Sequence, residues 1–151
     1  LFERMPQSLA DLLAETSMLT GDSRDIKYAV QARCIFLNAA IDTAAPADAD
    51  MIRAQVLKFA HEAMKKIPVF ELLEIIVNYG SPDSETILKM VRSCALLPAN
   101  APLSIHKVAG ASYLTDQQKR SLLQEMLDTV LAGPLSFYAY IARNQLDRIP
   151  D

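Results

Sequence analysis

Apolar residues recur at intervals of three and four positions along most of the chain, and this spacing restricts the fold more than any other feature. No run of five or more β-branched or aromatic residues alternates between turn signals as a strand would require. The sequence therefore predicts an all-α fold, a compact bundle of about seven helices. A short irregular solenoid of helical hairpins is the alternative, although tetratricopeptide and ankyrin repeat signatures are absent.

Caps, turns and prolines set the expected helix boundaries. Residues 69–79 are apolar on nearly every side, so we expect this helix to be the most buried, with Pro68 in its first turn and Gly80 ending it. Ser81 or Ser84 is the expected N-cap of the next helix, which stops before Pro98. The remaining expected helices cover residues 8–19, 23–44, 51–66, 115–132 (stopped by Gly133) and 136–148.

Residues 99–114 form the one long stretch without clear periodicity, and we expect an irregular loop there with a short helical turn at residues 103–108. The loop leads to Thr115, which together with Gln118 fits the capping box that begins a helix. Loops on a rigid scaffold commonly carry recognition, so this segment is an expected partner-binding region. Its expected contact residues are His106, Lys107 and Ser112.

The residue types that perform catalysis or bind metals do not form a recognisable pattern. His106 has Ser104 and Ser112 near it in the sequence, but no nucleophile motif surrounds them. His61 has Lys65 four residues later, where a zinc site would need a second ligand. We therefore expect no metal, no cofactor and no enzymatic activity.

Two further pairs of residues are interpreted as structural. Cys34 and Cys94 lie in apolar periodic segments and are expected to be buried free thiols, with a single disulfide as the alternative. Glu71 and Glu74 lie on the most apolar helix without a Glu-x-x-His motif, so we expect a solvent-facing stripe and not a di-iron site.

Composition limits the class of partner and the location. The net charge of −3 and the isoelectric point near 5.4 argue against a general nucleic-acid or anionic-membrane binder. No apolar run approaches the roughly 18–20 residues of a membrane span, and no signal peptide is visible. We expect a protein that works in the cytoplasm or is delivered into a cytosol.

Because the chain starts at Leu1, we expect a single domain, residues 1–151, excised from a longer protein.

The C-terminal helix carries three aromatic residues within four positions, Phe137, Tyr138 and Tyr140. Phe137 and Ile141 would form one inward stripe, which Tyr138 and Tyr140 cannot share. Tyrosine is favoured at interfaces because it buries area and keeps a polar hydroxyl. Tyr138, Tyr140 and Arg143 are therefore expected partner-binding residues.

The expected function is a non-enzymatic helical domain that binds another protein, of the adaptor, regulator or secretion-associated effector type. One alternative is an activator or enzyme that acts on a protein partner through the loop at residues 99–114. The other alternative is a structural dimerisation domain, in which the partner is a second copy of the chain.

Overall fold

The computed structural model describes residues 23–133 and 136–151, with side chains from residue 30 onward. Over these ranges it contains seven α-helices and two 3-10 helices, without a strand, so the predicted all-α fold is confirmed. The chain divides into two compact units, Leu1–Ser81 and Pro82–Asp151. The expected helix at residues 8–19 lies outside the described residues, and the single domain spanning residues 1–151 stays a prediction.

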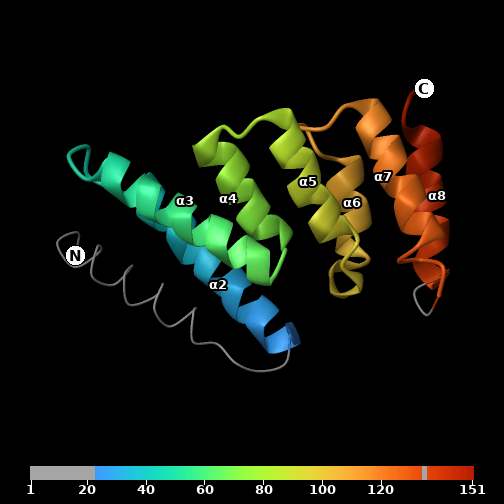
Figure 1. Cartoon of the computed structure of the whole chain (residues 1–151), viewed down its shortest axis with the longest axis horizontal. Helices are drawn as coiled ribbons and strands as arrows, with labels where there is room; N and C mark the ends of the chain where they lie inside the picture. The colour runs from blue at the N-terminus through green and yellow to red at the C-terminus, as the bar shows by residue number, and fades with distance from the viewer. Residues whose placement is uncertain (1–22, 134–135) are drawn as a thin grey trace. The chain divides into compact units, whose positions relative to one another are not determined.

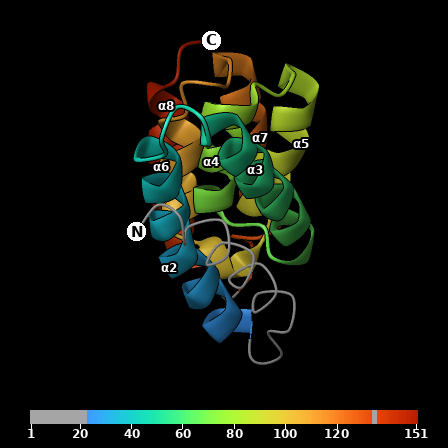
Figure 2. The same cartoon turned by 90° about the vertical axis from the view of Figure 1, so that its left-hand side faces the viewer.

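The first unit is built from α2 (Ser23–Asp42), α3 (Ala49–Lys66) and α4 (Phe70–Gly80), each of which packs against the other two (Figures 1 and 2). These bounds agree with the expected segments to within a few residues. Apolar side chains that repeat at helical spacing along α3 are buried, and they are Ile52, Val56, Phe59, Ala60 and Ala63.

Helix α4 has the longest apolar run and is the core of this unit, as predicted. Its buried side chains are Phe70, Leu72, Leu73, Ile75 and Ile76. The expected position of Pro68 is wrong, because the extended Val69 is the N-cap and Pro68 precedes it. Gly80 is the last helical residue, and a Cβ there would lie 3.0 Å from Cδ2 of Leu57 on α3. A glycine at this position therefore allows the two helices to approach closely.

The acidic residues of α4 do not form the expected solvent-facing stripe. Glu71 and Glu74 are both half-buried, and Glu71 accepts a hydrogen bond of 3.0 Å from Nε2 of Gln31 on α2. At the other end of α4, the Tyr79 hydroxyl donates to Oδ1 of Asp42 at 3.1 Å. Glu71 was expected at the solvent, whereas in the structure Glu71 and Tyr79 join α4 to α2.

Both cysteines are buried free thiols, as predicted. Burial raises the pKa of the Cys34 thiol to about 12, and the nearby negative charges of Glu71 and Glu74 contribute to the rise. A thiol reacts as its thiolate, so Cys34 is protected by both its pKa and its burial.

We expect a chromogenic disulfide reagent to modify neither thiol of the native protein and both thiols after unfolding in guanidinium chloride. The measurement is the absorbance of the released thiolate before and after addition of denaturant. A fast-reacting thiol in the native protein, or fewer than two thiols in denaturant without reductant, would contradict this arrangement.

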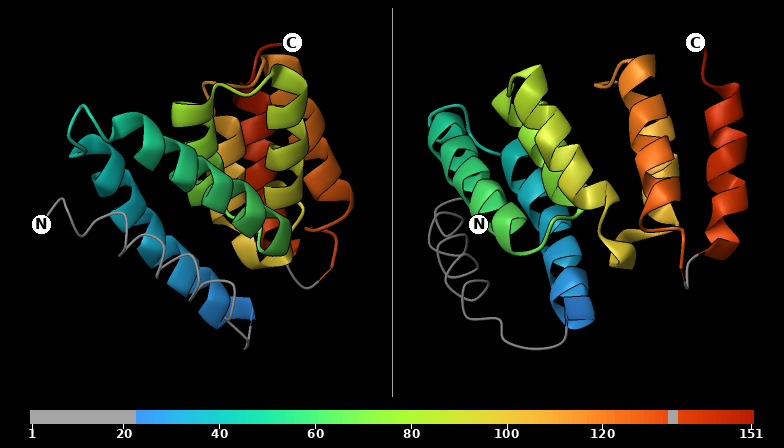
Figure 3. Two further views of the ribbon diagram at one scale, coloured as in Figure 1. Left: turned by 60° about the vertical axis from the view of Figure 1, so that its left-hand side comes forward. Right: turned by 45° about the vertical axis from the view of Figure 1, so that its right-hand side comes forward.

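The second unit contains the helices α5 (Ser84–Ala95), α6 (Leu103–Ala109), α7 (Asp116–Asp128) and α8 (Ala139–Arg148), and the 3-10 helices η2 (Pro98–Asn100) and η3 (Ser136–Tyr138). Helix α6 packs against α5, α7 and α8, and α7 packs against α8 (Figure 3). The short helical turn expected at residues 103–108 is confirmed, because α6 covers it. The irregular loop expected over the rest of residues 99–114 is shorter than predicted, because η2 occupies its start. The buried side chains of residues 99–114 are Asn100, Ser104, Ile105, Val108, Ala111 and Leu114.

The helix ends of this unit show which caps the sequence identified correctly. The capping box is confirmed: Gln118 N donates to Thr115 Oγ1 at 3.1 Å, and Thr115 N donates to Gln118 Oε1 at 3.0 Å. At the start of α5 the prediction is wrong, because the cap is Asp83, whose Oδ1 accepts from Thr86 N at 2.7 Å. This hydrogen bond to a backbone N–H lowers the pKa of Asp83.

Helix α7 ends four residues before the expected stop. The chain turns at Thr129, and Leu131 N donates to Met126 O at 2.9 Å. Leu131 is buried by this turn, and Ala132 and Gly133 are exposed beyond it. The helix therefore ends at the turn that buries Leu131, before the chain reaches Gly133.

Asn100 is one of two buried polar residues of the described chain, at 3 % exposure. Its Nδ2 donates to the carbonyl oxygen of Cys94 at 2.8 Å, in the last turn of α5. Carbonyls in the last turn of a helix lack an intrahelical donor, so this amide satisfies a group that would otherwise be incompletely bonded.

Candidate protein-binding surface

Helix α8 packs into the second unit through small side chains. The helix packs against α6 and α7 (Figure 3). Ala139 is 7 % exposed and Ala142 is fully buried. Alanine leaves little side chain between two helices, so α8 can lie close to its neighbours.

The large apolar side chains lie on the outer face. Phe137 is 75 % exposed and Tyr140 is 72 % exposed, whereas Tyr138 is half-buried. The rings of Phe137 and Tyr138 contact each other, with centroids 4.5 Å apart and planes at 52°. The expectation that Phe137 and Ile141 form an inward stripe is therefore wrong for Phe137, because the first turn is the 3-10 helix η3 and Ala139 takes the buried position.

Arg143 lies one turn after Tyr140 and is exposed. Residues three apart lie on the same side of a helix, so its guanidinium is on the side of the Tyr140 ring. It forms no ion pair or hydrogen bond within the described ranges. Exposed aromatic residues beside an arginine match the composition that is enriched at protein interfaces. We define the outer α8 face as Phe137, Tyr138, Tyr140 and Arg143.

The other predicted contact residues lie on α6 and in the turn that follows it. His106 is exposed on the outward side of α6, Lys107 is half-buried, and Ser112 is exposed before α7. Because α6 packs against α8, these residues and the outer α8 face belong to the same unit. Among the described residues, no side-chain hydrogen bond or ion pair joins His106 or Ser112 to that face.

The pairing of Ser104 with His106 that a nucleophilic mechanism would need is not present. Ser104 is fully buried on the inner side of α6, and its hydroxyl forms no hydrogen bond. His106 lies on the outer side of the same helix. No cluster of three or more potential metal ligands occurs in the part of the chain that the structure describes.

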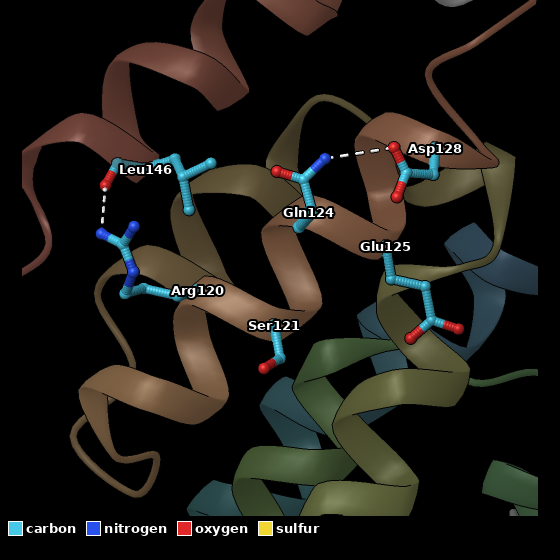
Figure 4. A pocket seen from close by; sticks show the side chains of 6 residues that line it. All are labelled: Arg120, Ser121, Gln124, Glu125, Asp128 and Leu146. Atoms are coloured by element: carbon cyan, nitrogen blue, oxygen red, sulfur yellow. Dashed lines mark hydrogen bonds between the residues drawn. The ribbon is translucent and has the colours of Figure 1, made fainter. Parts of the chain in front are cut away.

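A shallow groove between α7 and α8 has a volume of about 490 Å³ and is lined by polar side chains that mostly bond within the protein (Figure 4). Nη1 of Arg120 donates to the carbonyl oxygens of Leu146 and Ile149, at 3.3 and 2.9 Å. Gln124 donates to Asp128 at 3.1 Å. Arg120 thus satisfies carbonyls at the C-terminal end of α8, and the groove reflects helix packing.

Glu125 also lines the groove, and it pairs with Arg92 on α5. Nη2 of Arg92 lies 2.6 Å from Glu125 Oε1, and Nε donates to both carboxylate oxygens. The hydrogen bond from Arg92 lowers the pKa of Glu125. Because the pKa of Glu125 is lower in the folded state, its ionised carboxylate stabilises the fold at pH values above the ordinary pKa of a carboxyl group. This stabilisation is lost as the pH falls through the lowered pKa.

The sequence analysis predicted contacts at Tyr138, Tyr140 and Arg143 but not at Phe137, which is also exposed. The sequence pattern that could have identified Phe137 is the regular spacing of three residues from Phe137 to Tyr140 and from Tyr140 to Arg143. The alanines at 139 and 142 each directly precede one of these positions.

Of the helices that the structure describes, none has the length and apolar character needed to cross a membrane. Comparison with known proteins found no matching family model, no matching curated sequence and no matching solved structure.

Proposed function

We propose that this chain is a non-enzymatic helical domain that binds another protein through the outer α8 face. The observation that carries the proposal is the exposure of Phe137 in η3 and of Tyr140 on α8, next to the buried residues Ala139 and Ala142 of α8. Burying one large apolar side chain contributes about 1.5–3 kcal/mol, so these two rings offer substantial free energy to a partner that covers them.

The chemistry of the outer α8 face indicates the chemistry of its partner. Two aromatic rings favour an apolar groove or an apolar helix face on the partner. Arg143 favours a carboxylate at the rim of that groove, since an arginine binds a carboxylate through two parallel hydrogen bonds. With a net charge of −3 for the whole chain, a protein is a better partner than a nucleic acid. An adaptor, regulator or delivered effector in a cytosol is consistent with such a surface.

Site-specific photo-crosslinking tests this proposal in the native cell. A photoreactive phenylalanine analogue placed at position 140 is expected to capture a defined protein, and the same analogue at the exposed Lys89 of α5 is the matched control. Once the partner is purified, Phe137→Ala with Tyr140→Ala is expected to weaken binding by about tenfold or more. The Gln124→Ala variant is expected to bind as the unaltered chain does.

The outcome that overturns the proposal is an unchanged affinity of the Phe137→Ala, Tyr140→Ala chain. If His106→Ala and Ser112→Ala together abolish binding or activity instead, the alternative in which residues 99–114 act on the partner is correct. If light scattering shows a dimer that dissociates on Tyr140→Ala, the partner is a second copy and the chain is a dimerisation domain.

A further inference from the structure

Helix α3 presents a basic face to solvent in the first unit. Its apolar side is buried, and Lys58, His61 and Lys65 lie on the opposite side, at intervals of three and four residues. All three side chains are exposed, and so is Lys66 next to them. We define the basic α3 face as Lys58, His61, Lys65 and Lys66.

The three lysines have no carboxylate partner among the described residues. Glu62 is exposed and lies within one turn of all of them on the same helix. Nevertheless, neither Glu62 nor any of the lysines forms an ion pair or a hydrogen bond within the part of the chain that the structure describes. The ammonium groups are therefore open to carboxylates from another molecule.

The end of the helix accounts for only part of this face. Lys65 and Lys66 lie in the last turn of α3, where a positive charge complements the negative end of the helix dipole. Lys58 and His61 lie before that turn, and the effect of the dipole falls off beyond it. The basic face thus extends further along α3 than the helix dipole requires.

The basic α3 face continues an exposed stripe that starts near the beginning of the helix. Met51 is 45 % exposed and Ala54 is exposed, and the intervals between positions 51, 54, 58, 61 and 65 alternate between three and four. This is the spacing with which one side of a helix stays against a second helix. The outer side of α3 therefore offers an apolar half and a basic half, over a rise of about 21 Å.

We propose that the basic α3 face binds an acidic α-helix of another protein. Carboxylates on that helix pair with Lys58 and Lys65 and accept a hydrogen bond from a ring N–H of His61. An apolar side chain two turns further along the same helix packs on Met51. The inference does not rest on the proposed function, because the outer α8 face belongs to the other unit.

Spacing and charge favour an acidic helix over other polyanions. Lys58 and Lys65 are separated by a rise of about 10.5 Å, which two turns of a partner helix reproduce. Polybasic segments that bind anionic lipids carry clusters of roughly four to eight lysines or arginines. The basic α3 face has fewer lysines, with Glu62 among them, and the net charge of the whole chain is −3. A lipid surface or a nucleic acid is therefore attracted less than a helix whose carboxylates match these positions.

Fluorescence anisotropy of a labelled synthetic helix tests the proposal at low ionic strength, where surface charges are screened least. The probe is an alanine-rich peptide with glutamates at the spacing of Lys58, His61 and Lys65 and a leucine two turns beyond them. It is expected to bind the full chain, and the same peptide with glutamines in place of the glutamates is expected to bind at least about tenfold more weakly. Lys58→Glu with Lys65→Glu is expected to weaken binding of the glutamate peptide by a similar factor.

The matched control is Lys89→Glu with Arg148→Glu, which makes the same change of charge at exposed residues of the other unit. This control is expected to bind the glutamate peptide as the unaltered chain does. Circular dichroism confirms that each variant is folded. Should Lys58→Glu with Lys65→Glu not fold, Lys58→Gln with Lys65→Gln replaces it, with a smaller loss of affinity expected.

Three results would overturn the proposal. The first is equal binding of the glutamate and glutamine peptides. The second is an equal loss of affinity in the two double variants, because the net charge alone then sets the affinity. The third is tighter binding to vesicles of phosphatidylcholine and phosphatidylserine than to the glutamate peptide, because a lipid surface is then the ligand.

Discussion

We expect Phe70→Ala to lower the free energy of unfolding by about 3–5 kcal/mol. Phe70 is 1 % exposed, lies in the first turn of α4 and is the largest of the fully buried side chains. Its removal leaves a cavity between helices that pack on α4, and a cavity adds to the loss of apolar burial. Urea unfolding followed by the helical circular dichroism signal measures the effect.

Phe137→Ala is the matched control, because it removes the same atoms from a side chain that is 75 % exposed. We expect it to change the free energy of unfolding by no more than about 0.5 kcal/mol. Similar values for the two variants would show that α4 is not the core of its unit.

The second large effect is expected for Asn100→Ala, at about 1–3 kcal/mol. The variant removes the amide that donates to the Cys94 carbonyl at 2.8 Å, and that oxygen keeps the longer hydrogen bond of 3.4 Å from Leu97 N. Asn144→Ala provides the control, because Asn144 is exposed on α8. Thermal and urea unfolding of the two variants give the comparison, and equal stability would mean that solvent replaces the lost hydrogen bond.

Together these variants test whether residues 1–151 form a single domain. Phe70 belongs to the first unit and Asn100 to the second. In a single cooperative domain, both substitutions lower the midpoint of the same unfolding transition. Two transitions, each shifted by only one of the variants, would show that the units unfold independently.

Local signals made part of this structure predictable. The spacing of apolar residues predicted α3 and α4 and their buried faces, because a core face repeats with the period of the helix. The capping box at Thr115 and Gln118 was predicted because all of its atoms lie within four residues. The all-α fold follows from these signals repeated along the chain.

The features that were missed depend on contacts between segments. A helical turn was expected at residues 103–108, but the burial of Ile105 and Val108 against neighbouring helices was not. From the sequence alone Asn100 resembles a loop residue, because its hydrogen bond to the Cys94 carbonyl is seen only in the structure. Phe137 was expected on the inner side of the last helix, whereas Ala139 and Ala142 are the buried residues of α8 and Phe137 is exposed.

The alanine face of α8 has a consequence for how this chain can change. Because Ala139 and Ala142 make the contact with the rest of the unit, the side chains at positions 137, 140 and 143 contribute little to folding. Natural variants or engineered libraries can therefore alter these three positions with little loss of stability. Helix α8 provides a scaffold on which binding specificity can be exchanged while the fold is retained.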